Sequence, residues 1–161
     1  MNLFSTSHHY APSGFCLPPW SPRVSDIEAL AISAPVSAKD VKVSLWSFKP
    51  FKASGPDGLH LGFFQKCWNI VGGSVICEVS HIFSNGKMPE YLNKTLISLI
   101  PKCLGAETLT QFRPISLCNI VYKIMTKIIV NRIRPIIGNL VSPFQVAFVP
   151  GRRGIDNVII A

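Results

Sequence analysis

Arg113 is the residue of this sequence whose type and position most clearly suggest chemistry. It lies between a short β-branched apolar stretch, Thr95–Ile100, and a stretch from residue 117 to 137 whose apolar residues recur at helical spacing. The first stretch predicts a buried strand, on which Arg113–Ser116 pairs before the helix begins. A planar, permanently charged guanidinium at such a strand-to-helix corner suits phosphate. The sequence therefore predicts a phosphate contact at Arg113.

Positive charge also accumulates in the helical stretch after Arg113. The 161 residues hold 16 Lys and Arg against 8 Asp and Glu, a net charge of +8. This balance favours an anionic partner, either a nucleic acid or a membrane surface. At about 100° per residue, Lys123, Lys127 and Arg134 fall on one side of the helix. Arg132 falls instead within the apolar arc, where it must find a partner or emerge at a nucleic-acid groove.

Residues for metal-dependent catalysis are scarce. Phosphoryl transfer by a polymerase needs carboxylates that hold two divalent ions close together, yet the four aspartates are isolated and no Asp-Asp pair occurs. The five cysteines contain no Cys-x-x-Cys pair, so zinc and a disulfide framework are disfavoured and a reducing, intracellular compartment is indicated, nuclear or cytoplasmic. No run is long enough to cross a membrane. We expect no catalytic residue and no metal ligand in this chain.

The remaining elements follow from composition and periodicity. Residues 1–30 are rich in Ser, Pro and His and predict a poorly ordered tail, with one helical turn at Asp26–Ala31. Residues 31–161 are expected to form one unit. Helices are predicted at 37–48, 61–68 and 74–84, with a break at Gly72-Gly73 between the last two and a cap at Asn85-Gly86. Further along the chain, the sequence predicts an end or kink at Pro135, an extended segment at 145–149 and a helix from Asp156.

The loop Lys52–Gly58 allows two interpretations. Its Gly-Pro and Asp-Gly pairs interrupt regular structure. Lys52 and the loop amides can contact a nucleic acid, or the loop can be a tight turn that presents the next helix. Both interpretations stay open at the level of the sequence.

Four stretches, taken together, resemble a known family. They are Lys52–Gly58 with Phe63–Lys66 and Trp68, Phe112–Asn119 with Tyr122–Ile124, Asn131-Arg132, and Gln145–Arg152 with Asp156-Asn157. In this order and at this spacing they resemble reverse transcriptases of LINE-type, non-LTR retrotransposons, especially those of plants. The similarity extends from about residue 31 to the end of the sequence.

The resemblance implies a fold and partners. The family is an RNA-directed DNA polymerase with a right-hand architecture, and the chain would supply its N-terminal and fingers region without the palm that carries the catalytic aspartates. We therefore expect a mostly helical α+β fold with a short antiparallel sheet, inactive as a polymerase by itself. Its partners would be the RNA template, the DNA primer, a deoxynucleotide triphosphate and the missing palm region, with no membrane. Mg²⁺ is implied for the full-length enzyme, and no cofactor for this chain.

The resemblance also assigns roles to residues. Arg113, Gln145, Gly151 and Arg152 would bind the nucleotide or line its path. Nucleic-acid contacts are expected at Lys52, Lys123, Lys127, Arg132, Arg134 and Arg153. Two alternatives remain open: a non-enzymatic basic RNA-binding module, and a retroelement remnant without function.

Overall fold

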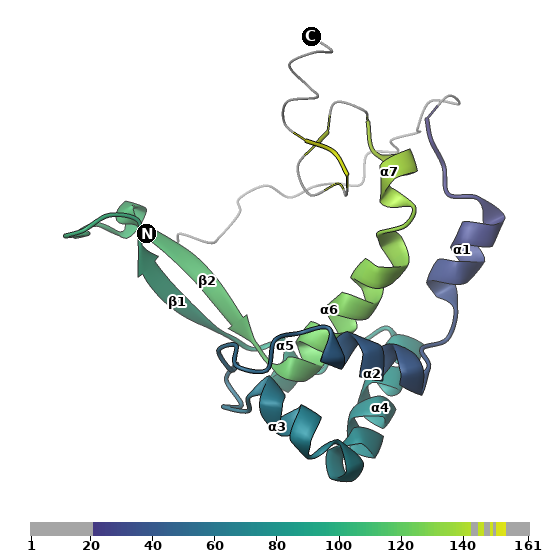
Figure 1. The fold of residues 1–161 in the computed structure, drawn as a ribbon, viewed down its shortest axis with the longest axis horizontal. Coiled ribbons are helices and arrows are strands. Elements are labelled where there is room, and N and C mark those ends of the chain that lie inside the picture. The colour runs from purple at the N-terminus through teal and green to yellow at the C-terminus, as the bar shows by residue number, and fades with distance from the viewer. Residues whose placement is uncertain (1–20, 143–144, 147–148, 150, 154–161) are drawn as a thin grey trace.

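A body of helices with one projecting β-hairpin makes up the fold (Figure 1). The computed structural model describes residues 21–142, 145–146, 149 and 151–153. The elements are α1 (Asp26–Ser33), α2 (Ala38–Trp46), α3 (Leu61–Lys66), α4 (Trp68–Asn85), α5 (Glu90–Asn93), β1 (Thr95–Pro101), the 3₁₀ turn η1 (Leu109–Gln111), β2 (Phe112–Cys118), α6 (Ile120–Ile133) and α7 (Ile137–Leu140). This confirms the mostly helical α+β class with a short antiparallel sheet. Most of the predicted tail and the predicted helix from Asp156 lie outside the described residues.

Capping boxes begin the first two helices. The hydroxyl of Ser25 accepts from the Glu28 N–H, and that of Ser37 accepts from the Asp40 N–H, while each carboxylate accepts from the backbone N–H of its serine. The predicted N-cap at Ser37 is confirmed. The single helical turn expected from Asp26 is the eight-residue helix α1.

The predicted break at Gly72-Gly73 is wrong, because α4 runs through both glycines. Gly72 is buried, and a Cβ there would lie 2.8 Å from the indole of Trp68. The glycine therefore gives the Trp68 ring room to lie against its own helix, and neighbouring turns offset its low helix propensity. The predicted left-handed cap after Asn85 is confirmed, since Gly86 has a φ of 65°.

The core lies where α6 packs on α2 and α4. Apolar side chains from five helices meet there. They are Val41, Leu45, Leu61, Phe64, Val75, Val79, Ile82, Leu92, Ile120, Ile124, Met125 and Ile128. Helix α6 contributes four of them, so its apolar arc is fixed against the body, and the direction of its adjoining basic side is fixed as well.

The hairpin β1–β2 corrects the prediction of a buried strand. The strands pair antiparallel from Thr95 opposite Cys118 to Pro101 opposite Phe112, as predicted for this segment. Every residue of β1 is exposed, however, including Leu96 and Ile97. Apolar composition predicted a strand correctly, but burial requires an element to pack on it, and within the described part of the chain neither face of the hairpin is covered.

The helical pattern after the hairpin begins later than its apolar spacing suggests. Leu117 and Cys118 still belong to β2, and α6 begins at Ile120. It ends at Ile133, two residues before Pro135, whose ring would clash with a carbonyl one turn earlier. The prediction that Pro135 ends this segment is confirmed.

Candidate nucleic-acid interface

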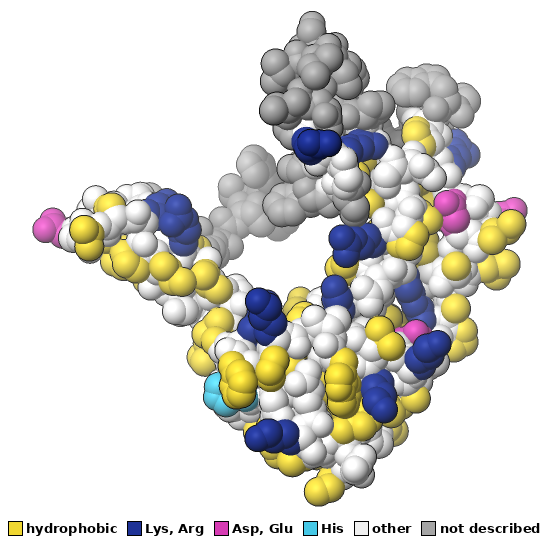
Figure 2. Space-filling view, viewed as in Figure 1, with side chains coloured by type: hydrophobic (Ala, Val, Ile, Leu, Met, Phe, Trp, Pro, Cys, Tyr) yellow, Lys and Arg dark blue, Asp and Glu magenta, His cyan; other side chains and the backbone are white. Residues whose placement is uncertain are grey.

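Lys and Arg side chains lie along the hollow between the hairpin and α6 (Figure 2). Helical geometry places Lys123, Lys127 and Arg134 on the same side of α6. Arg134 is exposed, and the two lysines are half-buried. We call these three residues the basic face of α6. Such a face can attract a phosphate backbone without reading its sequence.

Arg113 stands on β2, opposite Ile100. The residue is exposed, and the described residues offer its guanidinium neither a hydrogen bond nor an ion pair. Side chains of directly paired residues share one face of the hairpin, so Arg113 lies on the same face as Ile100. The pair two residues further along, Ser98 and Ile115, lies on this face as well. Its planar fork is therefore presented to solvent from a largely apolar strand surface.

Arg132 is bound by the protein itself. Its Nη1 donates to the carbonyls of Ile32 at 2.9 Å and Ala34 at 2.6 Å, and its Nη2 donates to Pro35 O at 3.2 Å. The Ile32 carbonyl belongs to the last turn of α1 and the other two follow that helix, so the guanidinium joins α6 to the end of α1 and to the α1–α2 connection. Of the two outcomes expected for a charge in the apolar arc, Arg132 has found partners. Its role in nucleic-acid binding stays a prediction.

Asp40 completes this contact. Its Oδ2 lies 3.5 Å from Arg132 Nη2 and accepts a hydrogen bond from the Ser37 N–H at 3.0 Å. The hydrogen bond from the Ser37 backbone lowers the pKa of Asp40 most, and the charge of Arg132 adds a smaller lowering. The carboxylate therefore stays ionised beside the guanidinium at neutral pH.

Arg152 is engaged in a similar way. Its two terminal nitrogens donate to four carbonyls around the end of α7, at distances of 2.5 to 3.2 Å. The acceptors are Gly138, Val141, Ser142 and Gln145. This cap satisfies carbonyls that the helix end leaves without intrahelical partners. The guanidinium predicted to bind nucleotide thus organises the turn in which it lies.

The other residues predicted for the nucleotide path lie in this turn. Gly151 has a φ of 82°, a conformation that only glycine adopts readily. Gln145 and Arg153 are exposed, and each has an interaction of its own. The structure thus gathers Gln145, Gly151 and Arg152 around α7, whereas Arg113 lies on the separate hairpin (Figure 1). Their predicted contacts with nucleotide and template are not tested by this arrangement.

The loop Lys52–Gly58 is fastened to the root of the hairpin. Asn119 Oδ1 accepts from the Asp57 N–H at 3.2 Å, and Lys123 Nζ donates to Ala53 O at 3.1 Å. The backbone of Gly55 lies so close that a Cβ there would be 2.5 Å from the Asn119 N atom. These contacts favour the interpretation of the loop as a turn that positions α3. Lys52 itself remains exposed, so its nucleic-acid contact stays a prediction.

Asn119 ends the stretch Phe112–Asn119, and the role of its side chain was not predicted from the sequence. It precedes the first residue of α6, a place where an asparagine side chain commonly caps a helix, but here it makes no cap. Its amide is 4% exposed and instead joins Asp57 to Tyr91, whose carbonyl accepts from Nδ2 at 3.3 Å. A polar residue between an apolar strand and an apolar helix was the available sign of this buried junction.

Comparison with known proteins gives two matches. Residues 100–160 match the family model described as Reverse transcriptase (RNA-dependent DNA polymerase). The Transposon TX1 uncharacterized 149 kDa protein of Xenopus laevis is 30% identical over 139 residues, which are 86% of this chain and 11% of that protein. The chain therefore spans about a tenth of the length of this relative. The aligned region contains the hairpin, α6 and the basic face.

Proposed function

Because this chain belongs to the LINE-type reverse transcriptases of non-LTR retrotransposons, we propose that its hairpin and α6 grip the template RNA and the incoming deoxynucleotide triphosphate of an RNA-directed DNA polymerase. The family as a whole acts on a nucleic-acid template with nucleotide substrates. In this proposal the hairpin and α6 bind the template and the nucleotide, as part of a longer protein that would carry the polymerase activity.

The different engagement of three arginines carries the proposal. Arg132 and Arg152 are each bonded to several backbone carbonyls. Arg113 has no such partner among the described residues and is exposed on β2. An unengaged guanidinium retains all five N–H donors for an external anion. Arg113 is therefore the arginine that we assign to the triphosphate, where a bidentate contact orients as well as attracts.

The basic face of α6 supplies the second part of the grip. Lys123 uses one of its three ammonium donors on Ala53 O, while the charged groups of Lys127 and Arg134 form no hydrogen bond or ion pair with described residues. Charges repeated along one side of a helix suit the regular spacing of phosphates. We propose that this face follows the template backbone and that Arg113, across the hollow, meets the nucleotide.

The described residues do not form a site for the Mg²⁺ that the family implies. Groups of three or more His, Cys, Asp or Glu close enough to hold a metal are absent from this part of the chain. Asp40 is bound to Ser37 and Arg132, and Asp57 accepts from the Leu59 N–H. We propose Mg²⁺ as a cofactor of the whole polymerase only. For the hairpin and α6 we propose binding alone.

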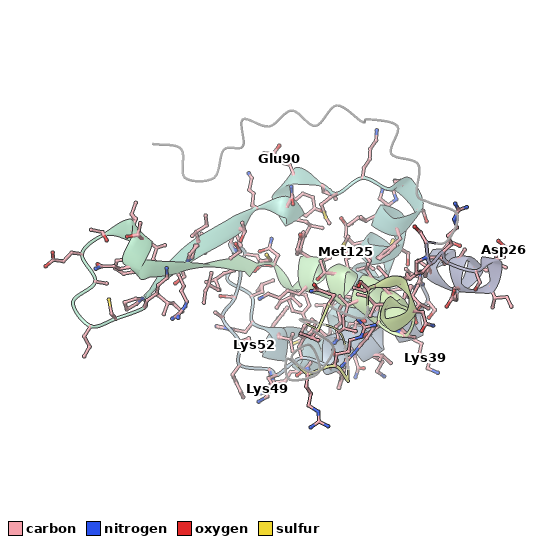
Figure 3. All side chains as sticks on the ribbon, turned by 90° about the horizontal axis from the view of Figure 1, so that it is seen from above. Asp26, Lys39, Lys49, Lys52, Glu90 and Met125 are labelled. Carbon is pink, nitrogen blue, oxygen red and sulfur yellow. The ribbon has the colours of Figure 1, made fainter. Side chains whose placement is uncertain are left out.

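Binding of the chain to a short single-stranded RNA over a range of salt concentrations tests the basic face. Lys127→Ala and Arg134→Ala should each reduce the slope of log affinity against log salt by about 0.7, the value for one lost phosphate contact on a single strand. Lys39→Ala is the matched control, because Lys39 is exposed on α2, at the end of the body away from the hairpin (Figure 3). Equal slopes for all three variants would contradict the proposal.

A membrane was the other anionic partner that the charge allowed. Within the described residues, no helix combines the length and the apolar character that a membrane span requires. Vesicles of anionic lipid can serve as a competitor in the RNA titration. Retention of RNA binding in their presence is the expected result.

A further inference from the structure

A pocket of ≈ 780 Å³ opens beside α3, and its lining residue Ala53 accepts a hydrogen bond from Lys123 of the basic face of α6. Its walls come from residues 50–53, where the Lys52–Gly58 loop begins, and from residues 60–67, which contain α3. They include Pro50, Phe51, Lys52, His60, Phe63 and Lys66. We propose that this pocket binds an unpaired base of single-stranded RNA, with Phe51 as the stacking surface.

The pocket is held open by contacts between its two walls. The Gly62 N–H donates to Pro50 O at 3.2 Å, and His60 Nδ1 lies 3.4 Å from Lys52 O. Phe63 is 40% exposed, and its ring packs edge-on against the buried Phe64 at a centroid distance of 5.4 Å. One aromatic wall is therefore anchored in the core before any ligand arrives. A preformed pocket reduces the ordering cost of binding.

Phe51 is the feature that points to a flat aromatic ligand. It is 91% exposed although it lines the pocket, so its ring contributes little to the core. An exposed phenylalanine beside an open apolar pocket offers a face on which a base can stack. Bases inside a duplex are already stacked on both faces, so an unpaired base is the ligand that gains from this surface.

The charge around the pocket fits the phosphates that flank such a base. Lys52 and Lys66 line the pocket, and no Asp or Glu is among its lining residues. Lys49 and Lys52 lie on the same side of the body, away from Glu90 (Figure 3). An aromatic face with cationic neighbours is the combination that binds single strands without sequence preference. The complementarity to a polyanion favours RNA over an apolar peptide.

This site rests on the proposed function only in that RNA is the partner. The basic face of α6 is expected to contact phosphates alone, whereas the pocket contacts a base. Intact and abasic oligonucleotides therefore separate the two, because they carry the same phosphates. A site that reads only charge binds both equally.

The experiment compares an oligouridine of about eight nucleotides with an abasic RNA of the same length at one salt concentration, using the full chain. Phe51→Ala should weaken binding of the oligouridine by about tenfold, as expected for loss of one stacked base, and leave the abasic affinity unchanged. Phe51→Trp should restore the oligouridine affinity. Ile70→Ala is the control, because Ile70 is an apolar side chain on α4 that is 83% exposed and is not among the residues lining the pocket.

The outcomes separate this inference from the proposed function. If the chain binds oligouridine and Phe51→Ala behaves like Ile70→Ala, the base site is overturned while the basic face stands. Equal weakening of both oligonucleotides by Phe51→Ala also overturns it, since the effect then does not depend on a base. If neither oligonucleotide binds the wild-type chain at low salt, the proposed function fails and this inference fails with it. Displacement of the abasic RNA by an acidic peptide without displacement of oligouridine supports the base site.

Discussion

Asn119 and Asp57 are joined by a hydrogen bond of 3.2 Å, from the backbone N–H of Asp57 to the side-chain oxygen of Asn119. The same amide donates to Tyr91 O, so one buried side chain connects the Lys52–Gly58 loop, the segment before β1 and the start of α6. The hairpin that carries Arg113 leaves the body at this junction. Its direction therefore depends on contacts that lie outside the hairpin.

Replacing Asn119 by alanine should destabilise the chain by roughly 1–3 kcal/mol, because the two hydrogen bonds of its buried amide are lost, each worth about 0.5–1.5 kcal/mol. The free energy of unfolding, measured by urea denaturation, checks this. Asn69→Ala is the control, since Asn69 is exposed on α4 and alanine favours a helix. Equal stability of Asn119→Ala and the wild type would show that water replaces the amide without cost.

Two glycines give a matched pair of opposite expected effects. A Cβ at Gly55 would lie 2.5 Å from backbone and side-chain atoms of Asn119, whereas a Cβ at Gly73 meets nothing within 4 Å. We expect Gly55→Ala to destabilise the chain by pushing the loop away from Asn119. Gly73→Ala should stabilise it by about 0.5–1 kcal/mol, because alanine loses less backbone entropy in a helix.

Thermal unfolding of both variants provides the measurement. Nuclear magnetic resonance shifts of Asp57 and Tyr91 add a local test, since Gly55→Ala should move them and Gly73→Ala should not. A stable Gly55→Ala protein with unchanged shifts would mean that the loop has room the structure does not show. The interpretation of this loop as a positioning turn would then lose its support.

The sequence predicted some of these features and missed others for physical reasons. The strand and helix around Arg113 follow from local apolar periodicity, which the sequence contains. The exposure of β1 does not, because the same apolar residues form a strand whether or not another element covers them. Likewise, the clamps of Arg132 and Arg152 use backbone carbonyls as acceptors, and every residue has one. The sequence therefore shows where the arginines are, but it cannot distinguish Arg132 and Arg152, which bind backbone carbonyls, from Arg113, which does not.

Acid should reveal the Asp40 contact. Its pKa is lowered in the folded chain from the ordinary 3.8, chiefly by the Ser37 N–H. Because the pKa is lower in the folded chain, the ionised carboxylate stabilises the fold at pH values above the ordinary pKa. This stabilisation is lost as the pH falls through the folded-state pKa. Asp40→Asn should thus be less stable than the wild type at neutral pH, and the difference should shrink below about pH 4.

Unfolding free energies across that pH range, for both proteins, provide the comparison. The Ser37 hydrogen bond is the main cause of the lowered pKa of Asp40. The stability difference that Asp40→Asn makes should therefore keep most of its pH dependence when it is measured in an Arg132→Ala background. Glu28, whose pKa is lowered mainly by the Ser25 N–H, also titrates in acid, so the substitution at Asp40 removes only part of the acid dependence. If the pH-dependent effect of Asp40→Asn disappears in the Arg132→Ala background, the ion pair with Arg132 is the main cause of the lowered pKa.

Arg113→Lys and Arg152→Lys should separate a ligand-binding arginine from a structural one. Both substitutions keep the charge and lose the planar fork. Arg152→Lys should lower the unfolding temperature, because one ammonium cannot serve the four carbonyls that the guanidinium caps. Arg113→Lys should leave stability unchanged, since no described residue depends on its side chain.

Nucleotide use provides the second half of this prediction. In a polymerase that includes these residues, Arg113→Lys should raise the KM for the deoxynucleotide triphosphate or lower its turnover, far more than it weakens RNA binding at matched salt. The bidentate contact orients the triphosphate, whereas RNA attraction needs only the charge that lysine retains. Arg134→Lys is the control, because its proposed partner is a phosphate without fixed orientation. If Arg113→Lys and Arg134→Lys leave nucleotide use equally unchanged, Arg113 is a solvated charge, and the assignment of the hairpin to the nucleotide is wrong.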